Sequence, residues 1–118
     1  MSNLLTDISD GIGTLTLNAP EARNTMTMPM VEEICAAMDA FEADEGCSSV
    51  IVTGAGSAFC AGADLGNLQT ATAESLGTIY EGFLRIARST LPTIAAVNGA
   101  AVGAGMNLGA DLGHQTRF

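Results

Sequence analysis

The chain has 118 residues, and 47% of them are hydrophobic, which is enough for one buried core. Thirteen acidic residues and four basic ones, all arginines, give a formal net charge of −9 at pH 7, which argues against nucleic acid or anionic lipid as a partner. Because the chain contains no lysine, a P-loop phosphate site and lysine-based catalysis are excluded as well.

The first predicted elements are two short strands, at residues 4–6 and 14–17, where the hydrophobic pattern alternates. Between them, Asp10 and Gly11 form a dipeptide that favours a tight hairpin turn. We therefore expect an antiparallel pair at the start of the chain.

A helix is predicted to begin after Thr27, a suitable N-cap residue, with Pro29 in its first turn, and to end near Ala43. Apolar side chains recur along it at intervals of three and four residues, which places them on one face. The face predicted to lie in the core consists of Met30, Ile34, Met38 and Phe41.

The segment "SSVIVTG" (48–54) is a short apolar run, typical of a strand covered on both faces. It leads directly into a loop of small residues at 56–68. A second amphipathic helix is predicted at 73–89, where Leu91 and Pro92 then end the helical pattern.

This strand and loop pattern then occurs a second time. "TIAAVNG" (93–99) resembles the earlier strand, and the segment at 100–112 is again rich in glycine and alanine, whereas the last ten residues show no clear period. No linker or charge block marks a boundary, so residues 1–118 are expected to form a single α/β domain, with strands packed under helices.

The cysteines and the single histidine indicate little metal or redox chemistry. Cys35, Cys47 and Cys60 are odd in number and lack a CxxC spacing, so we expect a cytosolic protein without disulfides. Cys60 is interpreted as a packed residue rather than a nucleophile, because His114 has no recognisable partner, and a lone histidine also disfavours a metal site. No apolar run is long enough to span a membrane.

The two glycine-rich loops have two interpretations. They could let a ligand lie against the main chain and accept hydrogen bonds from backbone N–H groups, or they could only permit tight turns and close packing. Neither loop has the GxGxxG pattern with a ribose-binding acid at the right distance, so a nucleotide-binding α/β module is a weaker alternative. Asp64 could cap a helix instead of reacting.

Three motifs carry a specific family resemblance. "LTLNAPEARNTMTMPM", "VIVTGAGSAFCAGADLGNL" and "LPTIAAVNGAAVGAGMNL" occur in this order and spacing in enoyl-CoA hydratase/isomerase proteins, the crotonase superfamily, which the chain resembles over residues 10–108. The resemblance implies a crotonase-like spiral of ββα units, trimers or dimers of trimers, and binding of acyl-CoA thioesters. It implies no separate cofactor, since coenzyme A is part of the substrate.

In this family the thioester oxygen lies between two backbone N–H groups. Matching the motifs assigns these donors to Ala63 and Ala104, with a helix opening near Gly105 adding its positive end. The same matching implies coenzyme or substrate contacts at Ala22, Arg23, Ala61, Asp64, Leu65 and Asn107. Arg23 could bind the coenzyme phosphates or be an ordinary solvated loop arginine.

The chain departs from the resemblance at its acid/base groups. Hydratases of the family are similar in having a glutamate three residues after the second donor, where this chain has Asn107, and their second glutamate lies further along than this sequence reaches. Glu74 and Glu81 are expected on the solvated side of their helix and not as replacements. Because family domains are longer, the chain is expected to be an N-terminal portion or a shortened member.

The resulting expectation is an acyl-CoA thioester-binding enzyme that stabilises an enolate. Loss of the first glutamate favours isomerase-like, hydrolase-like or other thioester chemistry over hydration. The alternative is a catalytically inert member that binds acyl-CoA or contributes to an oligomer.

Overall fold

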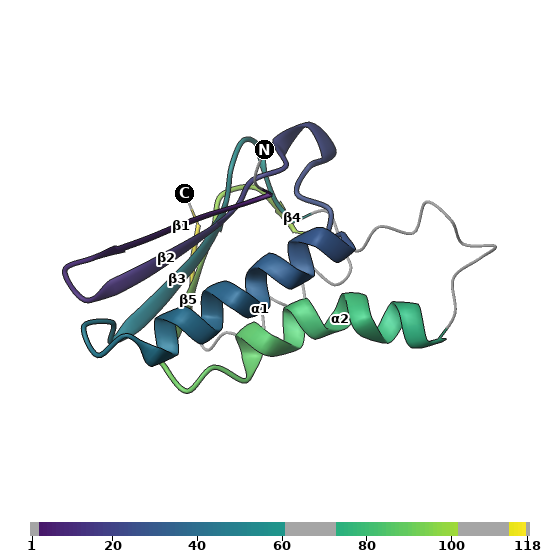
Figure 1. Cartoon of the computed structure of the whole chain (residues 1–118). Helices are drawn as coiled ribbons and strands as arrows, with labels where there is room; N and C mark the ends of the chain where they lie inside the picture. Colours follow the sequence, from purple (N-terminus) through teal and green to yellow (C-terminus); the bar gives the residue numbers. More distant parts are fainter. Residues whose placement is uncertain (1–2, 61–72, 102–113, 118) are drawn as a thin grey trace.

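The computed structural model describes residues 3–60, 73–101 and 114–117. One five-stranded sheet and one two-stranded sheet lie beside two helices and a short 3-10 helix (Figure 1). In chain order the elements are β1 (Leu4–Ser9), β2 (Ile12–Leu17), η1 (Pro20–Ala22), α1 (Met28–Ala43), β3 (Ser49–Gly54), β4 (Ala58–Cys60), α2 (Ala73–Ala87), β5 (Thr93–Val97), β6 (Ala100–Ala101) and β7 (His114–Arg117).

The larger sheet has the strand order β1-β2-β3-β5-β7. The pair β1 and β2 is antiparallel, and the turn between them has positive φ at Asp10 (53°) and Gly11 (80°), as the tight hairpin requires. This confirms the predicted hairpin, although both strands extend further towards the turn than the sequence pattern indicated. The remaining neighbours pair in parallel, and α1 and α2 lie in the connections that parallel strands need.

Both helices cover the same face of this sheet (Figure 1). Burial alternates along β2 accordingly: Leu15 and Leu17 are fully buried, whereas Thr14 and Thr16 on the other face are only half-buried. The predicted α/β arrangement, with strands packed under helices, is confirmed.

The core lies between this sheet face and α1 and α2. The predicted apolar face of α1 is confirmed, and it meets the buried side chains of the strands and of α2. The predicted N-cap is confirmed too, since the Thr27 side chain accepts a hydrogen bond from the Met30 N–H at 3.4 Å. Fully buried core residues include Leu15, Leu17, Met30, Ile34, Met38, Val50, Val52 and Ile86.

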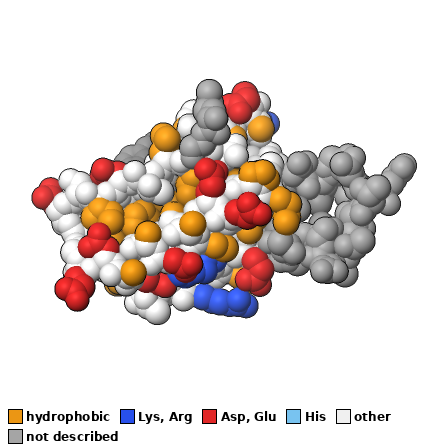
Figure 2. All heavy atoms as spheres, viewed as in Figure 1, with side chains coloured by type: hydrophobic (Ala, Val, Ile, Leu, Met, Phe, Trp, Pro, Cys, Tyr) orange, Lys and Arg blue, Asp and Glu red, His pale blue; other side chains and the backbone are white. Residues whose placement is uncertain are grey.

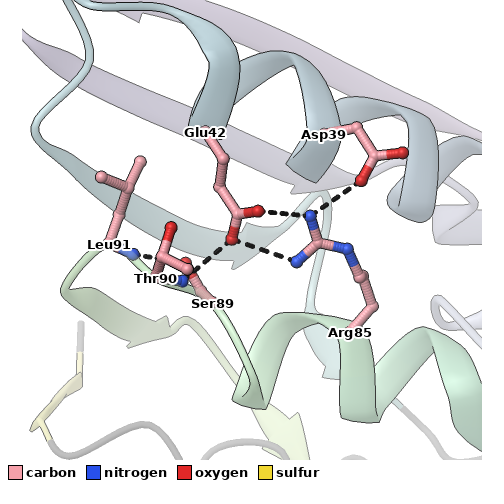
Figure 3. Close-up of polar contacts among 6 residues, drawn as sticks. All are labelled: Asp39, Glu42, Arg85, Ser89, Thr90 and Leu91. Atoms are coloured by element: carbon pink, nitrogen blue, oxygen red, sulfur yellow. Dashed lines mark hydrogen bonds and ion pairs between the residues drawn. The ribbon is translucent and has the colours of Figure 1, made fainter.

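One ion-pair cluster joins the two helices (Figure 3). The Arg85 guanidinium on α2 binds both carboxylate oxygens of Glu42 on α1, at 2.6 and 3.1 Å, and the Asp39 carboxylate at 2.8 Å. Glu42 also accepts the backbone N–H of Thr90 at 2.9 Å, which ties the start of the following loop to α1. The hydrogen bonds that Arg85 donates to the Glu42 carboxylate, together with the one from the Thr90 amide, lower the pKa of Glu42 to about 2.

We expect Glu42→Gln to lower the free energy of unfolding by about 2 kcal/mol at pH 7, because it removes the charge that Arg85 pairs with. The folded-state pKa of Glu42 lies below its ordinary value of 4.5, so the stabilisation is complete above that pH and is lost as the pH falls towards 2. Urea unfolding measured across this pH range should show that the difference in free energy of unfolding between the variant and the unaltered chain becomes smaller as the pH falls. Glu81→Gln is the control: Glu81 is 53% exposed and 3.6 Å from Arg88, so its loss should change stability by less than about 0.5 kcal/mol.

Candidate functional site

The two glycine-rich loops start from one small parallel sheet. β4 lies near the start of the first predicted loop (56–68) and β6 opens the second (100–112), and these strands pair in parallel with Ala58 opposite Ala100 and Cys60 opposite Ala101, with an irregularity between the two pairs. Parallel strands run in the same direction, so the chain leaves both strands at the same end of the pair. The structure therefore brings together the starting points of both loops.

Two glycines permit this close approach. A Cβ on Gly99 would lie 1.9 Å from the carbonyl oxygen of Ser57, and a Cβ on Gly54 would lie 2.6 Å from the carbonyl oxygens of Ala58 and Phe59. No side chain fits at either position. Gly54 and Gly99, which flank the two loops, therefore serve close packing of the two strand connections.

Asn24 is a fully buried polar residue between η1 and α1. Its side-chain oxygen accepts the Ala19 N–H at 2.8 Å, and its side-chain nitrogen donates to the carbonyls of Ala55 and Ala58 at 2.9 and 2.8 Å. Its backbone has a positive φ of 58°, a conformation that asparagine tolerates better than most residues. Asn24 thus fixes the segment after β2 to the connection between β3 and β4.

Asn98 reaches the same connection from the other side. It follows β5, and its side-chain oxygen accepts the Gly54 N–H at 3.2 Å. Its side-chain nitrogen donates to the carbonyls of Gly56 and Ala58 at 2.9 and 3.2 Å. The Ala58 carbonyl therefore accepts hydrogen bonds from two asparagine side chains that belong to distant segments. We refer to Asn24, Asn98 and the Ala58 carbonyl as the asparagine clamp.

The predicted coenzyme contacts Ala22 and Arg23 lie on the exposed surface beside this clamp. Their backbone N–H groups bond the carbonyls of Ala19 and Pro20, both at 3.0 Å, which closes the single turn of η1. Arg23 has a left-handed backbone (φ 56°), and within the part of the chain that the structure describes its guanidinium makes no ion pair. By contrast, Arg85 and Arg88 are both paired with carboxylates.

The other predicted site residues lie outside the described residues. These are the two expected oxyanion donors, Ala63 and Ala104, with Gly105, and the expected contacts Ala61, Asp64, Leu65 and Asn107. Their assignments stay predictions. The structure places the two strands that precede them, β4 and β6.

Within the described residues, no group of three histidine, cysteine or acidic side chains could hold a metal ion, and no helix is long and apolar enough to cross a membrane. Cys60 is fully buried, which confirms its interpretation as a packed residue. Burial raises the pKa of the Cys35 thiol, so this half-buried cysteine is not an activated nucleophile either. Glu81 is exposed on α2, as predicted.

The sequence pattern did not indicate the roles of Asn24 and Asn98, and it did not predict the short strands β4 and β6. Asn98 precedes a glycine, a dipeptide typical of turns, and Asn24 stands in a segment of turn residues, so neither had a pattern that predicts a role in a site. Apart from the Ala19 N–H, the hydrogen-bond partners of both side chains lie 31 to 44 positions away in the sequence. The one local signal is that asparagine tolerates a positive φ, which Asn24 has, and it does not reveal those partners.

Comparison with known proteins gives consistent matches. The enoyl-CoA hydratase/isomerase family profile matches residues 7–112. The protein named "Probable enoyl-CoA hydratase EchA14" of Mycobacterium tuberculosis is 44% identical over 109 residues, which cover 89% of this chain and 43% of that protein. The 1,2-epoxyphenylacetyl-CoA isomerase of Escherichia coli is 37% identical over 122 residues, covering 95% of this chain and 47% of that one.

Solved structures give the same result. An enoyl-CoA hydratase/isomerase from Xanthobacter autotrophicus superposes with a TM-score of 0.89 at 35% identity, covering 98% of this chain and 46% of that one. An enoyl-CoA hydratase from Bacillus anthracis superposes with a TM-score of 0.88 at 27% identity, covering 98% and 47%. The chain thus spans about half the length of the relatives it matches, and the expected fold is confirmed for that portion.

Proposed function

The chain belongs to the enoyl-CoA hydratase/isomerase (crotonase) family, and on that premise we propose that it binds acyl-CoA thioesters and stabilises their enolates. The proposed donors are the backbone N–H groups of Ala63 and Ala104. When a proton leaves the carbon beside a thioester, negative charge develops on the carbonyl oxygen. Each fixed N–H group aimed at that oxygen is worth roughly 3 kcal/mol.

The pairing of β4 with β6 is the observation that carries this proposal. Cys60 and Ala101 are register partners, and each proposed donor follows its strand by the same three residues: Ala63 follows Cys60, and Ala104 follows Ala101. Two segments that leave a parallel pair at the same end, with donors at equal offsets, are suited to approach one oxygen atom from two sides. A fold that used these loops only as connectors would not need that register.

The proposed coenzyme strip is the exposed segment at Ala22 and Arg23, continued by Ala61, Asp64 and Leu65. Coenzyme A carries several phosphate charges, and the chain itself has a net charge of −9, so a free cation is needed near the phosphates. Acidic side chains are spread over the helical face (Figure 2). Arg23, exposed and without an ion pair among the described residues, supplies a cation for this purpose.

The proposed chemistry is isomerase-like or another thioester reaction in preference to hydration. Asn107, proposed to contact the substrate, offers an amide where a proton-transferring carboxylate stands in the hydratases, and an amide does not exchange a proton at neutral pH. The same substitution favours a second candidate, a catalytically inert member that binds acyl-CoA. Turnover of an acyl-CoA by the chain would separate the two.

We also propose a cytosolic location and assembly as a trimer or a dimer of trimers. The three cysteines, Cys35, Cys47 and Cys60, are all free, which suits a reducing compartment. The assembly is proposed from family membership alone, and the oligomeric state in solution is measured by light scattering.

The test of this function is equilibrium binding of acetyl-CoA, compared with NAD and ATP. We expect acetyl-CoA to bind at least about tenfold more tightly than either nucleotide, because only the thioester engages both loops. Arg23→Gln should weaken acetyl-CoA binding by roughly threefold to tenfold through loss of a phosphate contact. Arg88→Gln removes another exposed arginine, one outside the proposed strip and paired with Glu81, and should leave the affinity unchanged.

Equal affinity for acetyl-CoA and ATP would instead favour a nucleotide-binding module. If the Arg23 and Arg88 variants lost acetyl-CoA affinity equally, the loss would come only from the change in net charge, and Arg23 would not belong to the site.

A further inference from the structure

We infer that Asn24 and Asn98 are positioning residues for the thioester site: through the carbonyl oxygen of Ala58 they hold the coenzyme segment and the two loop-bearing strands in one fixed arrangement. This inference rests on the proposed function. It assigns a separate task to each asparagine.

The two side chains of the clamp share one acceptor. Ala58 stands at the first position of β4, and its carbonyl oxygen is 2.8 Å from the Asn24 side-chain nitrogen and 3.2 Å from that of Asn98. Each nitrogen also donates to a second carbonyl, that of Ala55 for Asn24 and that of Gly56 for Asn98. Both hydrogens of each amide are therefore used, and the turn at 55–57 is held from two sides.

Each asparagine then connects this turn to a different part of the site. The Asn24 oxygen accepts the Ala19 N–H, so Asn24 ties the turn to the segment that carries Ala22 and Arg23. The Asn98 oxygen accepts the Gly54 N–H, and Asn98 stands two residues before β6, so Asn98 ties β4 to β6. Loss of Asn24 should release the coenzyme segment, whereas loss of Asn98 should let the two strands shift against each other.

The two losses should have different functional results. The position of the coenzyme segment decides how tightly the coenzyme moiety is held, and free coenzyme A, which has no thioester carbonyl, reports on it alone. The alignment of β4 with β6 decides whether both N–H groups reach one oxygen, since a displacement of about 1 Å is enough to lose most of the effect of a hydrogen-bond donor. A residue that only stabilised the fold would change both properties together.

The experiment compares three clamp variants of this chain with a control. Asn24→Gly removes the Asn24 side chain and suits the positive φ at this position. Asn98→Ala removes the second side chain, and Asn98→Asp keeps the acceptor for Gly54 but removes both donations. Thr53→Val is the control, because it removes one hydrogen bond between β3 and β5, from the Thr53 hydroxyl to the Ala96 carbonyl at 2.9 Å, and leaves the clamp intact.

Two quantities are measured for each folded variant: the affinity for free coenzyme A, and the infrared frequency of the carbonyl of bound, carbon-13-labelled acetyl-CoA. Hydrogen bonds from an oxyanion site polarise the carbonyl and lower its frequency. We expect both Asn98 variants to lose most of this lowering while the coenzyme A affinity stays within about twofold. Asn24→Gly should weaken coenzyme A binding about tenfold and keep the lowering in the bound fraction, and Thr53→Val should change neither.

Several results of this experiment would contradict the inference. An unaltered frequency in folded Asn98 variants, or an unaltered coenzyme A affinity in Asn24→Gly, would overturn the inference and leave the proposed function standing. Clamp variants that all fail to fold, or that lose affinity and frequency shift in equal proportion, would make the asparagines structural and would overturn it as well. If the unaltered chain binds no acetyl-CoA, the proposed function fails and the inference falls with it.

Discussion

Replacing Gly99 with alanine is expected to lower the free energy of unfolding by about 3 kcal/mol or more, enough to unfold a marginally stable domain. The added Cβ would lie 1.9 Å from the carbonyl oxygen of Ser57 and 3.3 Å from the Ala58 Cα. These atoms belong to the backbone, so the steric clash is relieved only if the turn before β4 moves away from β6. Urea unfolding, followed by circular dichroism, measures the loss.

The matched control is Gly46→Ala. Its Cβ would meet only the Asp44 side-chain oxygen, at 3.2 Å; this oxygen accepts the Gly46 N–H at 2.8 Å, but Asp44 is exposed, so a small shift of its side chain relieves the contact. We expect a change within about 0.5 kcal/mol for this variant. If Gly99→Ala were as stable as the unaltered chain, the two strand connections would not be in contact in solution, and the pairing of β4 with β6 would have to be abandoned.

Hydration of crotonyl-CoA by the chain is expected to stay at the rate in buffer. Hydration needs one group to deprotonate water and another to protonate the carbon beside the thioester, and each positioned group typically contributes about 10²- to 10⁴-fold. Asn107 stands where the hydratases have one of these carboxylates. The enolate-stabilising N–H groups that we propose cannot replace proton transfer.

The measurement is the loss of the enoyl-thioester absorbance with purified chain of confirmed mass. Among the described carboxylates, Glu81 is exposed on α2 and paired with Arg88, so it does not offer a buried acid/base group. Turnover above the buffer rate that disappears when one carboxylate of this chain is replaced would contradict the expectation and identify the group responsible.

Much of the fold could be predicted from the sequence because its main elements carry local signals. The hairpin follows from Asp10 and Gly11, the start of α1 from Thr27, and the core face of α1 from helical spacing. The end of α2 was placed two residues too late, because the helical pattern continues to Ser89 whereas the helix itself ends at Ala87. Residues at helix ends contribute few intrahelical bonds, so the pattern constrains them least.

Three strands could not be predicted, and the reason is physical. β4 has three residues and β6 has two, which is too short for any alternation, and β7 ("HQTR") contains no apolar residue. These segments are strands because a neighbouring strand supplies hydrogen bonds: β7 pairs in parallel with β5, and β4 with β6. Strand propensity depends on such partners, which a local pattern does not contain.

The candidate site, like the fold, could be predicted from the sequence only in part. The family motifs pointed to Ala22 and Arg23 as coenzyme contacts, which stays a prediction, and the structure describes both beside the asparagine clamp. The motifs gave no indication of the clamp, because a neutral amide has no charge or spacing that distinguishes such a residue from a turn former.

The asparagine clamp also sets the smallest unit that can form this site. Its hydrogen bonds to the turn at 54–58 join residues that are 31 to 44 positions apart in the chain, so none of them forms within a local segment. Bringing together residues so far apart costs loop-closure entropy, which the rest of the fold must offset. The shortest continuous piece that contains the coenzyme segment, the turn, β6 and the second proposed donor, Ala104, runs from 19 to 104, so the proposed thioester site depends on the cooperative fold and not on any single motif.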